Sequence, residues 1–162
     1  ILAGPNSRQE LRAMLSFRLE RMKVRVPVAT ASPADHDATL AALAWACEMT
    51  SLESAAERLM PGQVRWADFD RFLAEPEREF TAVATFFGHP APRDQVSAVL
   101  AGPLMRRYSK ALEYEYSPAL RRELLEEAAA EHRQAIAEAL AWLERAADSS
   151  PLLRRALDRA TT

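Results

Sequence analysis

The chain has 162 residues, of which 49% are apolar and 27% charged, close to the usage of ordinary globular proteins. Its formal net charge of −2 excludes the global positive field that draws proteins to nucleic acid or to anionic membranes. No stretch approaches the roughly 18 consecutive apolar residues that a membrane span requires, and the first residues lack the pattern of a signal peptide. We therefore expect a cytoplasmic protein without nucleic-acid or membrane partners.

Cysteine and histidine are few and scattered along the chain. Cys47 is the only cysteine and is surrounded by apolar residues, so we interpret it as a small buried core residue of a protein from a reducing compartment. His36, His89 and His132 show no metal-ligand spacing and no neighbouring nucleophile, and the chain contains no Gly-rich phosphate loop. The sequence therefore predicts no metal site and leaves the catalytic residues unknown.

Capping signals and helical periodicity predict helices along most of the chain, which contains only four glycines. Ser7 and Glu10 form a capping-box pattern, and apolar residues recur at helical spacing from there to about Lys23. A second helix is predicted over 33–59, because it opens with a Ser-Pro step, keeps an apolar face and stops at a Pro-Gly dipeptide.

The only predicted strand lies at 63–67, where the segment Gln63-Val64-Arg65-Trp66-Ala67 alternates polar and apolar residues after a turn signal. A single strand has no partner for its backbone donors and acceptors. We therefore expect the partner strands upstream of Ile1, and we interpret the chain, which begins without methionine, as part of a larger domain.

The remainder of the chain is predicted to be helical, apart from one basic segment without a sustained period. The predicted elements are a helical turn at 69–73, helices at 76–87 and 93–101, an irregular segment at 103–116, the longest helix at 118–147 and a last short helix from Ser150-Pro151. No internal repeat or linker divides the chain. We expect a single segment over 1–162 with its motifs at 63–118.

The basic segment contains the one cluster of residues that points to ligand chemistry. Three cations, a phenol and a hydroxyl follow one another at Arg106, Arg107, Tyr108, Ser109 and Lys110. Charge-assisted and neutral hydrogen-bond donors of this kind suit a phosphate or sulfate group. The residues alone leave open a second interpretation, in which the segment is a solvated basic surface loop.

Two motifs occur between the predicted strand and the long helix. The first begins with Val64-Arg65-Trp66-Ala67-Asp68-Phe69, where the predicted strand ends at an aromatic-acidic step. It continues through a leucine-containing turn and a helix that starts with proline to a closing Phe-Phe-Gly at Gly88. The second reads Gly102-Pro103-Leu104-Met105-Arg106-Arg107-Tyr108-Ser109-Lys110-Ala111 and precedes Tyr116-Ser117-Pro118 and the long helix. Both motifs resemble segments of the bacterial sulfotransferase family.

The resemblance implies a three-layer α/β P-loop-like sulfotransferase domain, of which this chain is the C-terminal part. A complete member transfers a sulfuryl group from 3′-phosphoadenosine 5′-phosphosulfate to a hydroxyl or an amine. The family's Pro-x-Ser-Gly phosphate loop, its 3′-phosphate pair and its catalytic base are absent here and expected upstream, so this chain alone is predicted to be inactive. By position, Arg106 to Lys110 correspond to the late basic loop that closes over the nucleotide, without its Gly-rich form.

The alternative is a non-catalytic helical interaction module. In this interpretation the long helices predicted at 33–59 and 118–147 bury their apolar stripes against a partner or against a second copy in a homodimer. A phosphate loop in the same reading frame upstream of Ile1 would favour the enzyme. Nothing in the sequence identifies the acceptor as a small molecule, a glycan or a peptide.

Overall fold

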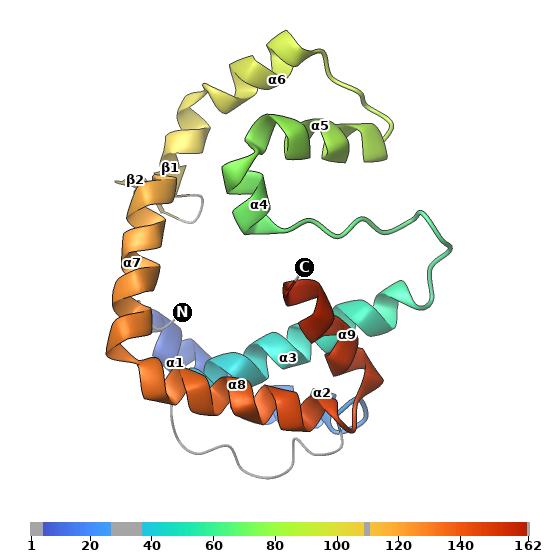
Figure 1. Ribbon diagram of the computed structural model, residues 1–162, viewed down its shortest axis with the longest axis vertical. Helices are drawn as coiled ribbons and strands as arrows, with labels where there is room; N and C mark the ends of the chain where they lie inside the picture. The colour runs from blue at the N-terminus through green and yellow to red at the C-terminus, as the bar shows by residue number, and fades with distance from the viewer. Residues whose placement is uncertain (1–4, 27–36, 109–110, 162) are drawn as a thin grey trace. The chain divides into compact units, whose positions relative to one another are not determined.

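The computed structural model describes residues 5–26, 37–108 and 111–161 and is predominantly helical, as expected (Figure 1). The chain divides into two compact units, which we describe separately. Unit 1 comprises Ile1–Met60 and Leu124–Thr162, and unit 2 comprises Pro61–Glu123.

Each unit is built from short helices. Unit 1 contains α1 (Pro5–Ala13), α2 (Leu15–Met22), α3 (Asp37–Ala56), α8 (Arg133–Ala147) and α9 (Pro151–Ala160). Unit 2 contains α4 (Phe69–Ala74), α5 (Pro76–Phe86), α6 (Arg93–Leu100), the 3-10 helix η2 (Pro103–Arg106) and the strands β1 (Arg107–Tyr108) and β2 (Ala111–Glu115). Helix α7 (Pro118–Glu131) begins in unit 2 and ends in unit 1.

Two helices predicted as continuous are each divided in two. The predicted helix over 118–147 consists of α7 and α8, and the predicted helix up to Lys23 consists of α1 and α2. The first break lies at Met14 (φ −95°, ψ 2°) and the second at His132 (φ −109°, ψ 22°). Backbone hydrogen bonds continue across both, for example from the Ile136 N–H to the His132 carbonyl at 2.9 Å. The apolar period therefore continues through each break, and for that reason the sequence pattern does not reveal it.

The start of the first helix and the extent of the second also differ from the prediction. Helix α1 begins at Pro5 rather than at the predicted cap Ser7, consistent with the preference of proline for the first turn of a helix. Helix α3 covers Asp37–Ala56, and the predicted residues 33–36 lie outside the described residues.

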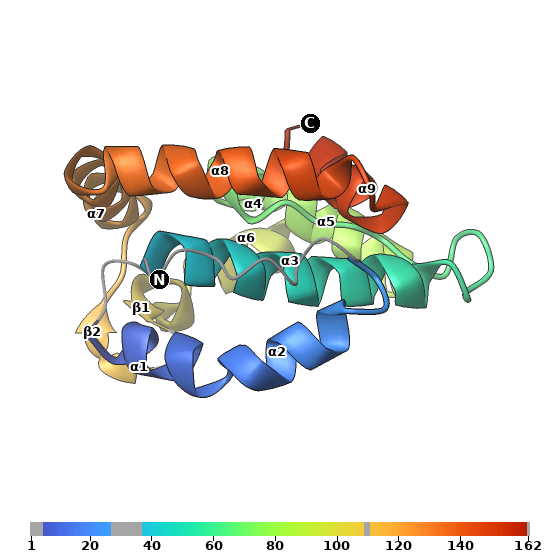
Figure 2. The same ribbon diagram turned by 90° about the horizontal axis from the view of Figure 1, so that it is seen from below.

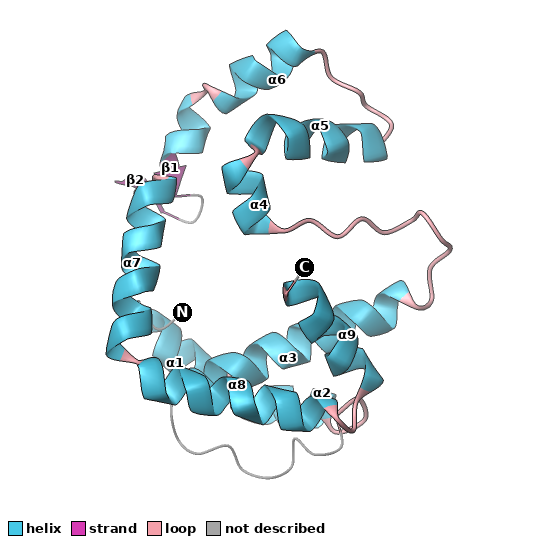
Figure 3. Cartoon of the chain, in the orientation of Figure 1, coloured by secondary structure: helices cyan, strands magenta, loops and turns pink. Residues whose placement is uncertain are grey.

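The strand predicted at 63–67 is wrong, because residues 64–68 have no regular secondary structure (Figure 3). Within the described residues no second strand pairs with this segment, and its polar side chains instead bind neighbouring helices. The described strands are β1 and β2, which form an antiparallel pair with Arg107 opposite Glu115 and Tyr108 opposite Ala111. The segment predicted as irregular at 103–116 therefore contains a hairpin. The strand that pairs with β1 follows only a few residues later in the chain.

Helix α3 is the centre of unit 1. Figure 2 shows α8 on one side of α3 and α1 and α2 on the other, while α9 packs against both α3 and α8. Alanines on α3 and α8 allow these helices to approach closely around larger apolar side chains. The main core cluster consists of Met22, Val26, Leu43, Ala46, Cys47, Leu143, Ala146, Ala147 and Leu153. Cys47 is fully buried, which confirms its interpretation as a core residue.

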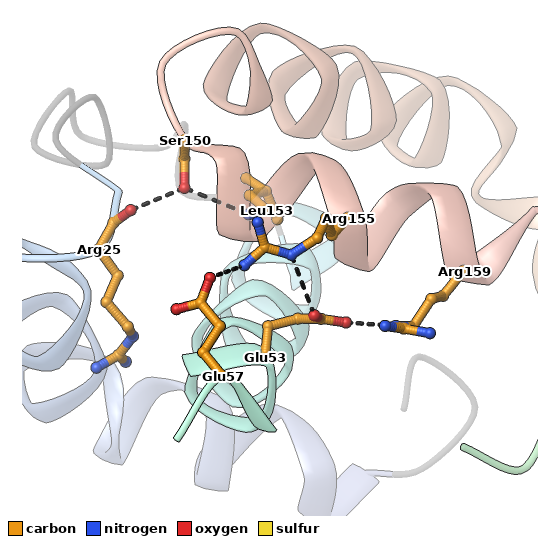
Figure 4. A network of polar contacts seen from close by, with 7 residues as sticks. All are labelled: Arg25, Glu53, Glu57, Ser150, Leu153, Arg155 and Arg159. Carbon is orange, nitrogen blue, oxygen red and sulfur yellow. Dashed lines mark hydrogen bonds and ion pairs between the residues drawn. The ribbon is translucent and has the colours of Figure 1, made fainter. Parts of the chain in front are cut away.

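A buried carboxylate joins α3 to α9 (Figure 4). The Glu53 side chain is only 3% exposed and forms ion pairs with Arg155 at 3.4 Å and with Arg159 at 2.5 Å. Arg155 also pairs with Glu57, which directly follows the end of α3. A buried charge is costly unless it is paired, so the position of Glu53 requires both arginines of α9 to lie over this part of α3.

Ser150 connects the start of α9 to the end of α2. Its buried hydroxyl accepts a hydrogen bond from the Leu153 N–H at 3.3 Å and donates one to the Arg25 carbonyl at 2.7 Å (Figure 4). The first contact is an N-cap of α9, as the Ser-Pro step predicts, and the second is a tertiary contact. One side chain therefore both starts α9 and fixes the chain that follows α2.

We expect Ser150→Ala to lower the free energy of unfolding by about 1–3 kcal/mol, since it removes the cap and the hydrogen bond that the Arg25 carbonyl accepts. Urea denaturation measures this difference. Ser149→Ala is the matched control, because the exposed Ser149 hydroxyl only donates to a carbonyl within its own helix turn. Equal stabilities of the two variants would contradict the assigned role of Ser150.

We also expect Glu53→Gln to lower the free energy of unfolding by about 1–3 kcal/mol. The effect stays below that of a fully buried pair because Arg155 and Arg159 are 40% and 42% exposed. Glu57→Gln removes a partner of the same arginine but from a largely exposed position, so it should cost less than about 1 kcal/mol. A larger loss for Glu57→Gln than for Glu53→Gln, in the same urea titration, would be inconsistent with this structure.

Candidate functional site

The hairpin of unit 2 carries the residues predicted to contact an anion. Arg106 is the last residue of η2 and has an exposed side chain, and its carbonyl accepts a hydrogen bond from the Tyr116 N–H at 3.0 Å. Arg107 and Tyr108 form β1, whereas Ser109 and Lys110 lie outside the described residues. This backbone hydrogen bond brings the start and the end of the hairpin together. The contacts of these residues with an anion stay a prediction.

Tyr116 belongs to this site although sequence reasoning did not assign it a role. Its phenol oxygen is buried and has no hydrogen-bond partner in the part of the chain that the structure describes. A buried hydroxyl without a partner typically costs about 1–3 kcal/mol, so it is a group that a ligand can satisfy. Only burial reveals this property, because the sequence shows the tyrosine but not its missing partner.

A second charged cluster in unit 2 surrounds a buried glutamate of α5. The Glu79 side chain is 3% exposed and lies 3.0 Å from Arg71 of α4 and 3.6 Å from Arg65 in the segment before it. Both arginines come from the first motif. Their contacts attach the irregular segment and α4 to α5, so these motif residues have a structural role in this fold.

The acidic residues of the first motif also bind neighbouring elements. Asp68 is the N-cap of α4 and accepts a hydrogen bond from the Arg71 N–H at 2.6 Å. Asp70 forms an ion pair with Arg121 of α7, and the same guanidinium lies over the Phe69 ring, 5.5 Å from its centroid. In this arrangement Asp68 and Asp70 therefore have structural contacts with α4 and α7.

Unit 1 contains an open apolar groove with a volume of about 380 Å³. Alanines make up half of its lining, which creates the space, and the rim residue Leu140 is 55% exposed. The groove can accept apolar surface, but it offers no group for acid-base or nucleophilic chemistry. Its lining residues are Ala38, Ala41, Ala42 and Trp45 of α3, Ile136, Ala139, Leu140 and Leu143 of α8, and Leu157 and Ala160 of α9.

Two further features are absent from the described part of the chain. It contains no group of three or more histidine, cysteine, aspartate or glutamate side chains arranged to hold a metal ion. None of its helices combines the length and the apolar character that crossing a membrane requires.

No protein family, characterised protein or solved structure with which the chain was compared matches it.

The Glu79 cluster predicts a local loss of stability in one variant. Glu79→Gln removes the carboxylate that holds Arg65 and Arg71, so amide hydrogen exchange in α4 and α5 should become about tenfold faster, which corresponds to roughly 1.4 kcal/mol. Glu77→Gln is the matched control on the same helix, because the Glu77 side chain is half exposed and pairs with the exposed Arg93. Exchange in the control should stay within about twofold of the wild-type rate.

Proposed function

We propose that this chain is the C-terminal part of a sulfotransferase-like domain and that its hairpin contacts the phosphosulfate nucleotide. Two motif resemblances at 64–88 and 102–118 support the assignment. The donor is 3′-phosphoadenosine 5′-phosphosulfate, and the acceptor is a hydroxyl or an amine. In this proposal the phosphate loop and the catalytic base come from the same domain upstream of Ile1.

The observation that carries the proposal is the combination of donors at the hairpin. Arg106 is exposed and therefore accessible to a ligand, Arg107 follows it directly, and the buried phenol of Tyr116 lacks a partner in the described residues. A guanidinium provides a planar fork of N–H donors that matches a phosphate, and a phenol adds a neutral donor. The hairpin thus carries charged donors at its start and a neutral donor at its end, and a backbone hydrogen bond from Tyr116 to Arg106 joins the two ends.

The role of the hairpin in the reaction is to bind the nucleotide. During transfer the sulfur–oxygen bond to the phosphate breaks, a bond from sulfur to the acceptor oxygen or nitrogen forms, and the nucleotide leaves as the bisphosphate. Arginines near a phosphate of the nucleotide hold the donor in position while negative charge moves onto the leaving group. Deprotonation of the acceptor belongs to the upstream residues of the proposed domain.

The apolar groove favours a second candidate function, the non-catalytic helical interaction module. All ten residues that line the groove are apolar, and Leu140 remains largely exposed at its rim. A module of this type would use unit 1 and would have no need of Arg106 or Tyr116. Nucleotide binding by the hairpin therefore separates the two candidates.

We expect Arg106→Ala and Arg107→Ala each to weaken binding of 3′-phosphoadenosine 5′-phosphate by about ten- to a hundredfold, since a charge-assisted hydrogen bond contributes roughly 1.5–3 kcal/mol. Arginine-to-lysine changes should restore only part of the affinity, because an ammonium cannot form the bidentate fork. Isothermal titration calorimetry of the natural protein that contains this chain gives the dissociation constants.

Arg122→Ala provides the control for these variants, because Arg122 is an exposed arginine of α7 without an ion pair in the described part of the chain. It should leave the affinity unchanged. Tyr116→Phe should weaken binding by only a few-fold, as expected for the loss of one neutral hydrogen bond. Unchanged affinity in all of the hairpin variants would indicate that the hairpin is a solvated basic surface, and it would favour the interaction module.

A further inference from the structure

Three arginines of unit 1 face the same turn of α3. Arg18 and Arg21 lie on α2 at a spacing of three residues, and Arg25 follows in the turn after the helix. At about 100° per residue, this spacing places all three on one face. Arg21 and Arg25 contact residues of this turn of α3 directly, and Arg18 lies one helical turn before Arg21 on the same face of α2.

Arg21 and Arg25 are held in place by neutral groups. Arg25 donates from Nε to the Thr50 hydroxyl at 3.2 Å and from Nη2 to the Cys47 carbonyl at 3.5 Å. Arg21 donates to the Ser51 hydroxyl at 3.3 Å, and its guanidinium stacks over the Phe17 ring at 5.4 Å from the centroid. These contacts orient both guanidinium groups but neutralise neither charge.

Arg18 differs from both in having buried nitrogens without a neutral partner. Its Nε and Nη1 atoms are buried and have no hydrogen-bond partner within the described residues. A guanidinium cannot shed its proton to avoid the cost of burial, because its pKa lies far above neutrality. A cation with two such nitrogens is therefore a position at which an external acceptor can bind.

Within the described residues no carboxylate pairs with this cluster. The ion pairs of unit 1 in the described part of the chain use Arg12, Lys23, His132, Arg154, Arg155 and Arg159, and none involves the three arginines of this face. Glu48 is close enough to act on Cys47, yet it forms no ion pair with them either. Burial, followed by Glu48, raises the pKa of the Cys47 thiol despite the three cations, so the thiol stays neutral and supplies no counter-charge.

We propose that Arg18, Arg21 and Arg25 form a binding site for a tetrahedral oxyanion, a phosphate or sulfate group, in unit 1. The anion accepts a hydrogen bond from the unused Nη1 at the end of the Arg18 guanidinium, and the charges of Arg21 and Arg25 add attraction from the same face. The two terminal nitrogens of a guanidinium present parallel N–H groups that match two oxygens of such an anion. This site lies in unit 1 and is independent of the hairpin in the proposed function.

Thermal unfolding of the 162-residue chain in increasing inorganic phosphate tests the site, with sodium chloride keeping the ionic strength constant. Phosphate should raise the unfolding midpoint of the wild type. In Arg18→Gln the apparent dissociation constant should increase at least about tenfold, and in Arg21→Gln about threefold. Without phosphate, Arg18→Gln should unfold at or above the wild-type midpoint, because a neutral amide replaces an unpaired buried cation.

A control variant shows that the effect belongs to this face. Arg145→Gln removes an exposed arginine of α8 that has no ion pair in the described residues. It should keep the full response to phosphate. Parallel titrations with sulfate and with a nucleoside 5′-monophosphate distinguish between a free anion and an esterified one. Tighter binding of the nucleoside monophosphate than of inorganic phosphate would assign the site to an esterified ligand.

The decisive comparison is between the wild type and the two variants on α2. No phosphate response in the wild type would overturn the proposal, and so would an equal response in the wild type, Arg18→Gln and Arg21→Gln. If Arg18→Gln does not fold, Arg21→Gln decides alone, because Arg21 is exposed and its replacement leaves the core unchanged.

Discussion

The burial of the Glu53 carboxylate constrains how α9 packs in unit 1. A charge placed almost entirely out of water must be paired, and in the described part of the chain Arg155 and Arg159 of α9 are its partners. This requirement positions α9 on α3 and places Leu153 in the core beside Leu143. The apolar groove then follows, because it lies where α3, α8 and α9 meet around small alanine side chains.

Unit 2 uses the same device on a smaller scale. Glu79 of α5 is as deeply buried as Glu53 and is likewise paired with two arginines from another segment, Arg65 and Arg71. The described side chains of this unit include few large apolar ones that are buried, so a paired carboxylate contributes specificity that packing alone would not provide. In both units an acidic side chain on one helix therefore determines which basic segment lies against it.

The local part of this fold could be predicted from sequence, and the long-range part could not. Ser150-Pro151 predicts the start of α9, and Gly88, which has a φ of +76°, marks the turn after α5 as expected of glycine after a helix. The alternation at 63–67 was misleading, because whether such a segment becomes a strand depends on a partner elsewhere in the chain. The hydrogen bonds of Glu53 with Arg155 and Arg159 span 102 and 106 residues, beyond the reach of local sequence patterns. The unpaired polar atoms of Arg18 and Tyr116 can be recognised only once the surrounding residues are placed.

The burial of Cys47 has a practical consequence for chemical labelling. It is the only thiol of the chain, it has no exposed surface, and its raised pKa keeps it in the unreactive protonated form near neutrality. Maleimides and similar thiol reagents should therefore not react with the folded wild-type chain. A single cysteine introduced at an exposed position, such as Val24 or Met60, would be the sole point of attachment for a fluorophore or a spin label, without prior removal of a native thiol.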